Sequence, residues 1–179
     1  MGTVPFQGDA PLSPVTIISN YGLAFIPKNL EPRTQAVLRH LMRKPKAKSD
    51  GPGYIYALRL IDNAHPDRVH IKLGRTNDIP RRLSEHRRRC PSSRHVLLGH
   101  TGLVPHCDRL ERLIHIELAD RAAQAYPAGR TAPRTRCTDC GSVHTEIFTF
   151  RPFHGRNFRN EWLRSIVERW AQFVSSHVI

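Results

Sequence analysis

The sequence contains no apolar run near the roughly 18 residues needed to cross a membrane, so no membrane span is expected. Residues 1–14 lack a basic stretch followed by an apolar core, so no secretory signal is expected. The four cysteines then indicate metal ligands or free thiols rather than disulfides. We expect an intracellular protein, nuclear if its host is eukaryotic, because basic runs such as residues 87–89 can direct nuclear import.

Acidic residues are scarce: 15 Asp and Glu stand against 28 Lys and Arg, which leaves a formal net charge of +13. A surplus of this size favours a polyanionic partner, nucleic acid before an anionic membrane surface. Arg outnumbers Lys, which favours bidentate contacts with phosphate. DNA is therefore the expected partner, and the oligomeric state is left open.

The length of 179 residues suits one domain with a hydrophobic core rather than two domains. Residues 1–50 are interpreted as an N-terminal arm, a short helix and a linker. Residues 31–43 predict the amphipathic helix, and residues 44–53, which extend into the start of the main domain, have the composition of a flexible linker. Residues 51–179 are expected to form the main domain.

Hydrophobic periodicity predicts the order strand, strand, helix, strand, helix at the start of the main domain. The expected strands are residues 53–62, 68–74 and 95–100, with a turn at residues 63–67 between the first two. The first expected helix is capped by Asn77 or Asp78, and the second spans residues 108–125. After a basic loop at residues 127–136, we expect a strand through Phe148 and Phe150 and a closing helix at residues 158–175.

Four short motifs follow one another along these predicted elements. They are Gly53-Tyr54-Ile55-Tyr56, Lys72-Leu73-Gly74-Arg75-Thr76, Arg82 with His86, and Glu111 at the start of an apolar helix. In this order and at these separations, they resemble the core of the GIY-YIG nuclease superfamily. The resemblance implies an α+β fold, with a small GIY-YIG-like mixed sheet in a β-β-α-β-α core.

The resemblance is closest to a DNA-binding branch of this superfamily found in phages and fungi. In that branch the second motif reads Lys-Ile-Gly-Arg-Thr, and a His-x-Glu-Trp-Phe-like segment ends the domain. The corresponding segments here are Lys72-Leu73-Gly74-Arg75-Thr76 and His144-Thr145-Glu146-Ile147-Phe148.

The resemblance also implies roles for five side chains in phosphodiester hydrolysis. Tyr56 would take the proton of the attacking water, and Arg82 would hold the scissile phosphate. Glu111 would bind one Mg²⁺ or Mn²⁺ ion, and His86 would orient the water or a phosphate oxygen. Lys72 stands where the name-giving motif has its second tyrosine. We expect it to lower the pKa of Tyr56, which must fall by roughly three units from about 10.

Further arginines are expected to form the electrostatic footprint on nucleic acid. They are Arg75, Arg81, Arg82, Arg87, Arg88, Arg89, Arg130, Arg134 and Arg136. Cys90, which follows three of them, is interpreted as a neutral thiol without a role.

A second site is predicted from Cys137, Cys140 and His144, whose spacing is that of a zinc knuckle. Zinc prefers four tetrahedral sulfur or nitrogen ligands, so one more ligand is needed. His115 is the first choice for it and Cys107 the second. Such a structural zinc would stabilise the C-terminal strand and closing helix.

The leading hypothesis is a GIY-YIG-type, metal-dependent endonuclease that cuts DNA. The first alternative is a catalytically inactive DNA-binding module of the same fold, which Lys72 in place of the second tyrosine favours. The second alternative is a zinc-scaffolded interaction domain whose basic surface serves localisation.

Overall fold

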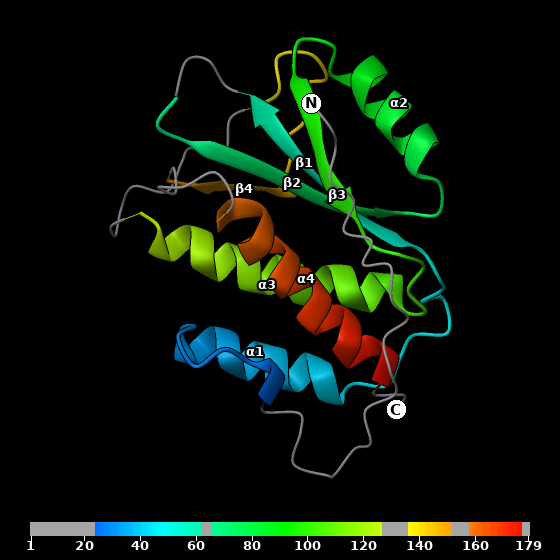
Figure 1. The fold of residues 1–179 in the computed structure, drawn as a ribbon, viewed down its shortest axis with the longest axis vertical. Coiled ribbons are helices and arrows are strands. Elements are labelled where there is room, and N and C mark those ends of the chain that lie inside the picture. Colours follow the sequence, from blue (N-terminus) through cyan, green and yellow to red (C-terminus); the bar gives the residue numbers. More distant parts are fainter. Residues whose placement is uncertain (1–23, 62–65, 127–135, 152–157, 177–179) are drawn as a thin grey trace.

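The computed structural model describes residues 24–61, 66–126, 136–151 and 158–176, and these residues form a sheet covered by helices (Figure 1). This arrangement confirms the predicted α+β class. The strands are β1 (Tyr54–Ile61), β2 (Val69–Thr76), β3 (Arg94–His100) and β4 (Ile147–Phe150), and the helices are α1 (Pro32–Arg43), α2 (Ile79–Arg89), α3 (Cys107–Gln124) and α4 (Phe158–Ser176).

The four strands lie in the order β3-β1-β2-β4, and each neighbouring pair is antiparallel. The prediction of a mixed sheet is therefore wrong for the described strands. The reason is the position of β1: it lies between β2 and β3, which run in the same direction but are not neighbours. The register pairs Tyr56 with Gly74 and Leu58 with Lys72, so the two expected motifs lie side by side.

The hydrophobic core lies on the face of the sheet that α3 and α4 cover (Figure 1). Alternate residues of β1 and β2 point into it, among them Ile55, Ala57, Ile71 and Leu73. The apolar stripe predicted for α3 is fully buried, and it consists of Leu110, Leu113, Ile114 and Leu118. In α4, the predicted packing residues Ile166, Trp170 and Val174 are also buried.

A buried carboxylate joins α3 to α4. Glu117 has no exposed surface and accepts hydrogen bonds from Arg121, from Arg169 and from the indole nitrogen of Trp170. Because every partner is a donor, the burial of this charge is compensated.

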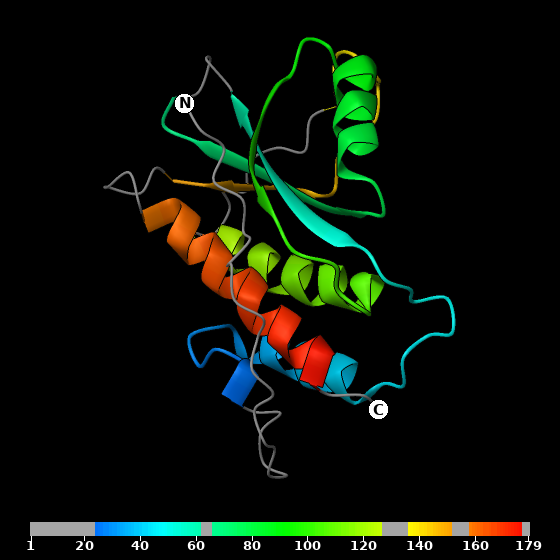
Figure 2. The same ribbon diagram turned by 45° about the vertical axis from the view of Figure 1, so that its right-hand side comes forward.

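Helix α2 lies over the opposite face of the sheet (Figures 1 and 2). Of the two predicted capping residues, Asp78 is the N-cap, and its side chain accepts a hydrogen bond from the backbone N–H of Arg81 at 2.9 Å. None of the residues of α2 is buried. Apolar packing therefore contributes little to holding α2 on the sheet.

Helix α1 packs on α3, on the side away from the sheet (Figure 2). Leu38 and Met42 of α1 belong to the same core cluster as the main domain. In the segment predicted to be a flexible linker, Asp50 is 9% exposed and accepts hydrogen bonds from the backbone N–H groups of Asp108 and Arg109. Asp50 thus caps the N-terminus of α3. The predicted domain boundary at residue 50 stays a prediction.

Several predicted segments lie partly or wholly outside the described residues. These are the N-terminal arm up to residue 23, most of the turn at residues 63–67, and the basic loop up to residue 135. Among the described helices, none is long and apolar enough to cross a membrane.

Candidate functional site

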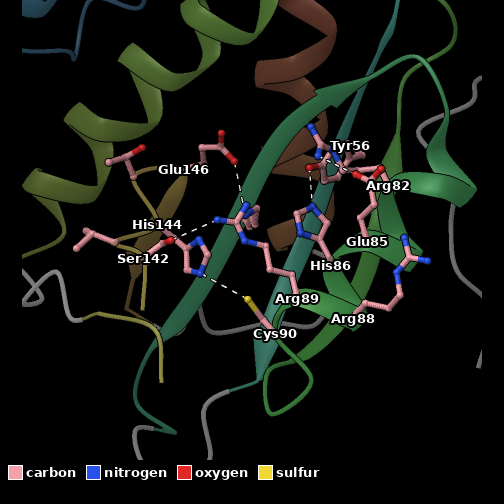
Figure 3. A pocket seen from close by; sticks show the side chains of 13 residues that line it. Tyr56, Arg82, Glu85, His86, Arg88, Arg89, Cys90, Ser142, His144 and Glu146 are labelled. Atoms are coloured by element: carbon pink, nitrogen blue, oxygen red, sulfur yellow. Dashed lines mark hydrogen bonds and ion pairs between the residues drawn. The ribbon is translucent and has the colours of Figure 1, made fainter. Parts of the chain in front are cut away.

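A polar cavity of about 650 Å³ opens between α2, the sheet and residues 142–146 (Figure 3). Tyr56 and Lys72 line it from adjacent strands, and Arg82 and His86 line it from α2. The pairing of β1 with β2 and the helical spacing of four residues explain this convergence. Four of the five predicted catalytic side chains therefore meet in one cavity.

The closest contact in the cavity joins β1 to α2. The phenolic oxygen of Tyr56 lies 2.8 Å from Nε2 of His86 (Figure 3). The ring of His86 also stacks on His95 of β3, with 5.7 Å between ring centroids. His86 is thus held between two strands of the sheet.

The surroundings shift the pKa values of both groups. Burial, and then the charges of Lys72, His95 and Arg82, lower the pKa of His86 to about 4. Burial raises the pKa of Tyr56 above its ordinary value, against the opposing effect of Arg82. A neutral imidazole beside a protonated phenol lets the phenol donate to Nε2, which places the ring proton of His86 on Nδ1.

The prediction of a lowered pKa for Tyr56 is wrong, and the nearby positive charge that opposes the rise is that of Arg82 rather than Lys72. The pKa of Tyr56 is raised rather than lowered, because burial outweighs the nearby positive charge. Lys72 itself is buried, with its ammonium nitrogen 3.6 Å from a carboxylate oxygen of Glu146. The charge of Lys72 is therefore compensated by Glu146.

Arg82 enters the cavity from α2 together with a carboxylate. Its guanidinium donates to Glu85 at 3.0 Å, and Arg81 donates to the other oxygen of the same carboxylate. The Nε atom of Arg82 is buried and has no hydrogen-bond partner among the described residues. The side chain of Arg82 is nevertheless 41% exposed, so another part of it is open to solvent.

Glu111, the fifth predicted catalytic residue, does not line the cavity. Its carboxylate accepts a hydrogen bond from Nε of Arg75 at 3.1 Å, and another nitrogen of Arg75 lies 2.9 Å from Asp108. Burial raises the pKa of Glu111, while His115 and Arg75 oppose the shift. Glu111 is close enough to raise the pKa of Tyr56, but Arg75 occupies its carboxylate.

The arginines predicted to contact nucleic acid occupy different settings. Arg88 and Arg89 line the cavity, and Arg87 is exposed on the same helix. Arg136 is exposed and donates to the backbone oxygen of Gly141. Arg130 and Arg134 lie outside the described residues.

Three cysteines and one histidine meet at one end of the cavity. Ligand atoms of Cys90, Cys137, Cys140 and His144 all lie within 4.8 Å of one another. The backbone of residues 137–142 forms a tight turn, in which the N–H of Gly141 donates to the carbonyl of Cys137 at 2.8 Å. The predicted Cys-x-x-Cys and histidine are thus brought together as a group that can hold a structural zinc ion.

The prediction for the fourth ligand is wrong, since Cys90 occupies that position. His115 points elsewhere: its Nε2 lies 2.9 Å from the backbone oxygen of Leu73, and its ring packs on Phe148. Cys107 is buried beside Gly53, outside the cluster. Cys90, interpreted from the sequence as a neutral thiol, thus belongs to a group that can hold zinc.

Three residues of this site were not predicted as functional: Cys90, Glu85 and Glu146. Cys90 lies 47 residues before Cys137 in the chain, so no local spacing reveals it. Glu85 stands three residues after Arg82, and that helical spacing could have indicated an ion pair. Glu146 lies in the segment from His144 to Phe148 that resembles the end of the family's domain, but the resemblance implied no role for it.

Comparison with protein-family models identifies a domain in this chain. The family model of the T5orf172 domain matches residues 53–171, which is more than half of the chain. Neither the curated proteins nor the solved structures contain a significant match to the chain. The T5orf172 domain indicates a function related to nucleases or DNA binding. Because this match covers most of the chain, the chain belongs to the T5orf172 domain family.

Proposed function

We propose that the protein is a GIY-YIG-type, metal-dependent endonuclease that hydrolyses phosphodiester bonds in DNA. The observation that carries this proposal is the meeting of Tyr56, Lys72, Arg82 and His86 in one cavity large enough for a backbone phosphate. The family and the net charge of +13 support nucleic acid as the substrate.

The hydrogen bond between Tyr56 and His86 offers a route for the proton of the attacking water. A phenol with a raised pKa is a poor base when it must hold a negative charge alone. The neutral Nε2 of His86, 2.8 Å away, can take the phenolic proton as the phenol takes the proton of the water. In this proposal the two residues act together as the general base.

Arg82 is the candidate for holding the scissile phosphate. Its side chain lines the cavity and is 41% exposed, and a guanidinium suits bidentate contact with phosphate oxygens. Positive groups placed where charge develops in the transition state are a main source of catalysis.

Glu111 would hold the Mg²⁺ or Mn²⁺ ion, which when bound supplies charge relief at the phosphate. A partly exposed carboxylate is a suitable ligand for such an ion, and the side chain of Glu111 is 19% exposed. Because Arg75 binds this carboxylate, the proposed role requires Arg75 to turn away, for example toward a DNA phosphate.

Plasmid nicking tests the proposal. Supercoiled DNA is incubated with the purified full-length chain and Mg²⁺ or Mn²⁺. We expect nicked product from the wild type, and none from Glu111→Ala or Arg82→Ala. Arg164→Ala and Glu168→Ala serve as matched controls, because these two residues form an exposed ion pair on α4. Nicking by Glu111→Ala at the rate of the wild type would contradict the proposal.

A second candidate is a catalytically inactive DNA-binding module of the same fold. The ion pair between Arg75 and Glu111 favours it, because this pair leaves no free carboxylate on α3 near the cavity. DNA retardation without cutting, whichever divalent metal is added, would support this candidate over the endonuclease. Failure to retard DNA or RNA at low salt would contradict both, and would favour a zinc-scaffolded interaction domain.

A further inference from the structure

We propose that Cys90, Cys137, Cys140 and His144 bind one zinc ion that fastens α2 to residues 136–146 and so holds the cavity together. Cys90 follows the last residue of α2, while the other three ligands belong to the segment on the opposite side of the cavity. Cys90 and His144 themselves line the cavity (Figure 3). The ion would therefore be part of its wall.

Four of the six distances between the ligand atoms are close to those of a tetrahedral zinc site, and all six lie within 4.8 Å. Zn–S bonds of about 2.3 Å and Zn–N bonds of about 2.0–2.1 Å place two sulfurs about 3.8 Å apart, and a sulfur and a nitrogen about 3.6 Å apart. The sulfur of Cys90 lies 3.7 Å from the sulfurs of both Cys137 and Cys140. Nε2 of His144 lies 3.5 Å from Cys140 and 3.7 Å from Cys90. A disulfide would need about 2.05 Å between sulfurs, so these thiols are not cross-linked.

Both sides of the cavity lack the apolar packing that usually holds a fold together. No residue of α2 is buried, and none of residues 136–146 is buried either. The core clusters on the other face of the sheet. Small units without enough apolar burial are commonly stabilised by a metal, because the ligands come together only in the folded state and metal binding therefore favours that state.

Two further contacts join the chain around Cys90 to the segment that carries the other three ligands. The carboxylate of Asp139 accepts a hydrogen bond from the backbone N–H of Ser92, and Arg89 donates to Ser142. Gly141 has a φ of +67°, a left-handed conformation that favours glycine and allows the turn after Cys140. The two contacts hold the two ligand-bearing segments close to each other.

Metal content tests the site directly, and Cys107 supplies a matched control. Cys90 is 4% exposed and Cys107 is 3% exposed, but only Cys90 belongs to the cluster. Full-length protein is purified without chelator, and its zinc is measured by mass spectrometry. We expect one zinc ion per chain in the wild type and in Cys107→Ser, and a loss of stoichiometric zinc in Cys90→Ser. Equal zinc in the two variants, or no zinc in the wild type, would overturn the proposal.

Hydrogen exchange on the wild type tests the zinc site without any variant, and so remains informative if Cys90→Ser does not fold. Removal of zinc with a chelator should speed exchange in α2 and in residues 136–146, while α3 and the described part of α4 stay protected. Re-addition of zinc should reverse the change. Uniform loss of protection, or no change in α2, would show that the ion does not fasten this side of the cavity.

Any effect of zinc on DNA binding rests on the proposed function. The same protein samples distinguish failure of the zinc site from failure of the proposed function. If both proposals hold, chelation weakens DNA retardation, and zinc restores it. Stoichiometric zinc without any DNA binding would overturn the proposed function and leave the zinc site standing. DNA binding by a wild type that holds no zinc would overturn the zinc site and leave the proposed function standing.

Discussion

A β-carbon on Gly74 would lie 2.6 Å from the phenolic oxygen of Tyr56 and 2.8 Å from its Cζ atom. These two residues face each other across the pairing of β1 and β2, so the tyrosine ring lies directly over the glycine. The ring cannot move away freely, because Tyr56 is only 2% exposed and is hydrogen-bonded to His86. The glycine of the second motif is therefore required by the tyrosine of the first.

We expect Gly74→Ala to displace the Tyr56 ring and destabilise the protein. Overpacking of this kind costs about 1–3 kcal/mol. For a chain of this size, each kcal/mol lowers the melting temperature by about 2–4 °C. Gly102→Ala is the control, since a β-carbon there meets nothing within 4 Å. Thermal unfolding that is the same for both variants would show that the Tyr56 ring is not fixed over Gly74.

The pair of Tyr56 and His86 predicts a clean separation of cutting from binding. We expect Tyr56→Phe to keep its fold and its DNA affinity, and to lose nicking activity by about 10²–10⁴-fold, the usual contribution of a positioned proton acceptor. Tyr54→Phe, on the same strand but packed against His100, should keep its activity. Equal nicking rates for the two variants, measured at one metal concentration, would remove Tyr56 from the chemistry.

The elements were predictable because each depends on a local pattern. The periodic apolar residues of α3 gave its bounds to within one residue, and Asp78 marked the start of α2 as its cap. The fourth ligand of the cysteine cluster was not predictable in this way. It required knowing that the end of α2 lies over residues 137–144, and that arrangement arises from the order of the strands.

The candidate catalytic residues show the same division. The meeting of Tyr56, Arg82 and His86 followed from two local motifs and one strand pairing. Their protonation states and ion pairs could not be predicted in this way, because they depend on burial and on partners distant in the chain. Arg75 is 36 residues from Glu111, and nothing in the sequence indicated that these two would pair.

The lowered pKa of His86 predicts how its contribution to stability depends on pH. Between pH about 6.5 and about 4, the imidazole is protonated in the unfolded chain but neutral in the folded one. The unfolded state then binds more protons, so stability rises with pH across this window and is lost as pH falls through it. We expect His86→Gln to lose less stability than the wild type between pH 6.5 and pH 4.5, as measured by urea unfolding.

His40→Gln is the matched control for that experiment, because His40 is exposed on α1, away from the cavity. Both variants keep the cysteine cluster, so proton binding by its ligands affects them equally. A pH dependence of His86→Gln identical to that of His40→Gln would mean that His86 is not kept neutral by its surroundings.

The ion pairs of Glu85 predict that this carboxylate weakens DNA binding. Glu85 neutralises Arg81 and Arg82, both of which would otherwise present their full charge to a phosphate. We expect Glu85→Gln to bind duplex DNA more tightly, by up to about fivefold, since exposed ion pairs are worth about 0.2–1 kcal/mol. The slope of log affinity against log salt should steepen by about 0.9 for each additional phosphate contacted.

Glu168→Gln is the control for this last comparison, because it removes the same charge from a similar pair with Arg164 on α4. Retardation of one duplex over a series of salt concentrations measures both variants. If the two gave the same affinity and the same slope, only the net charge would matter. Arg81 and Arg82 would then not contact phosphate. A steeper slope for Glu85→Gln alone would place the DNA backbone at the mouth of the cavity, beside Tyr56 and His86.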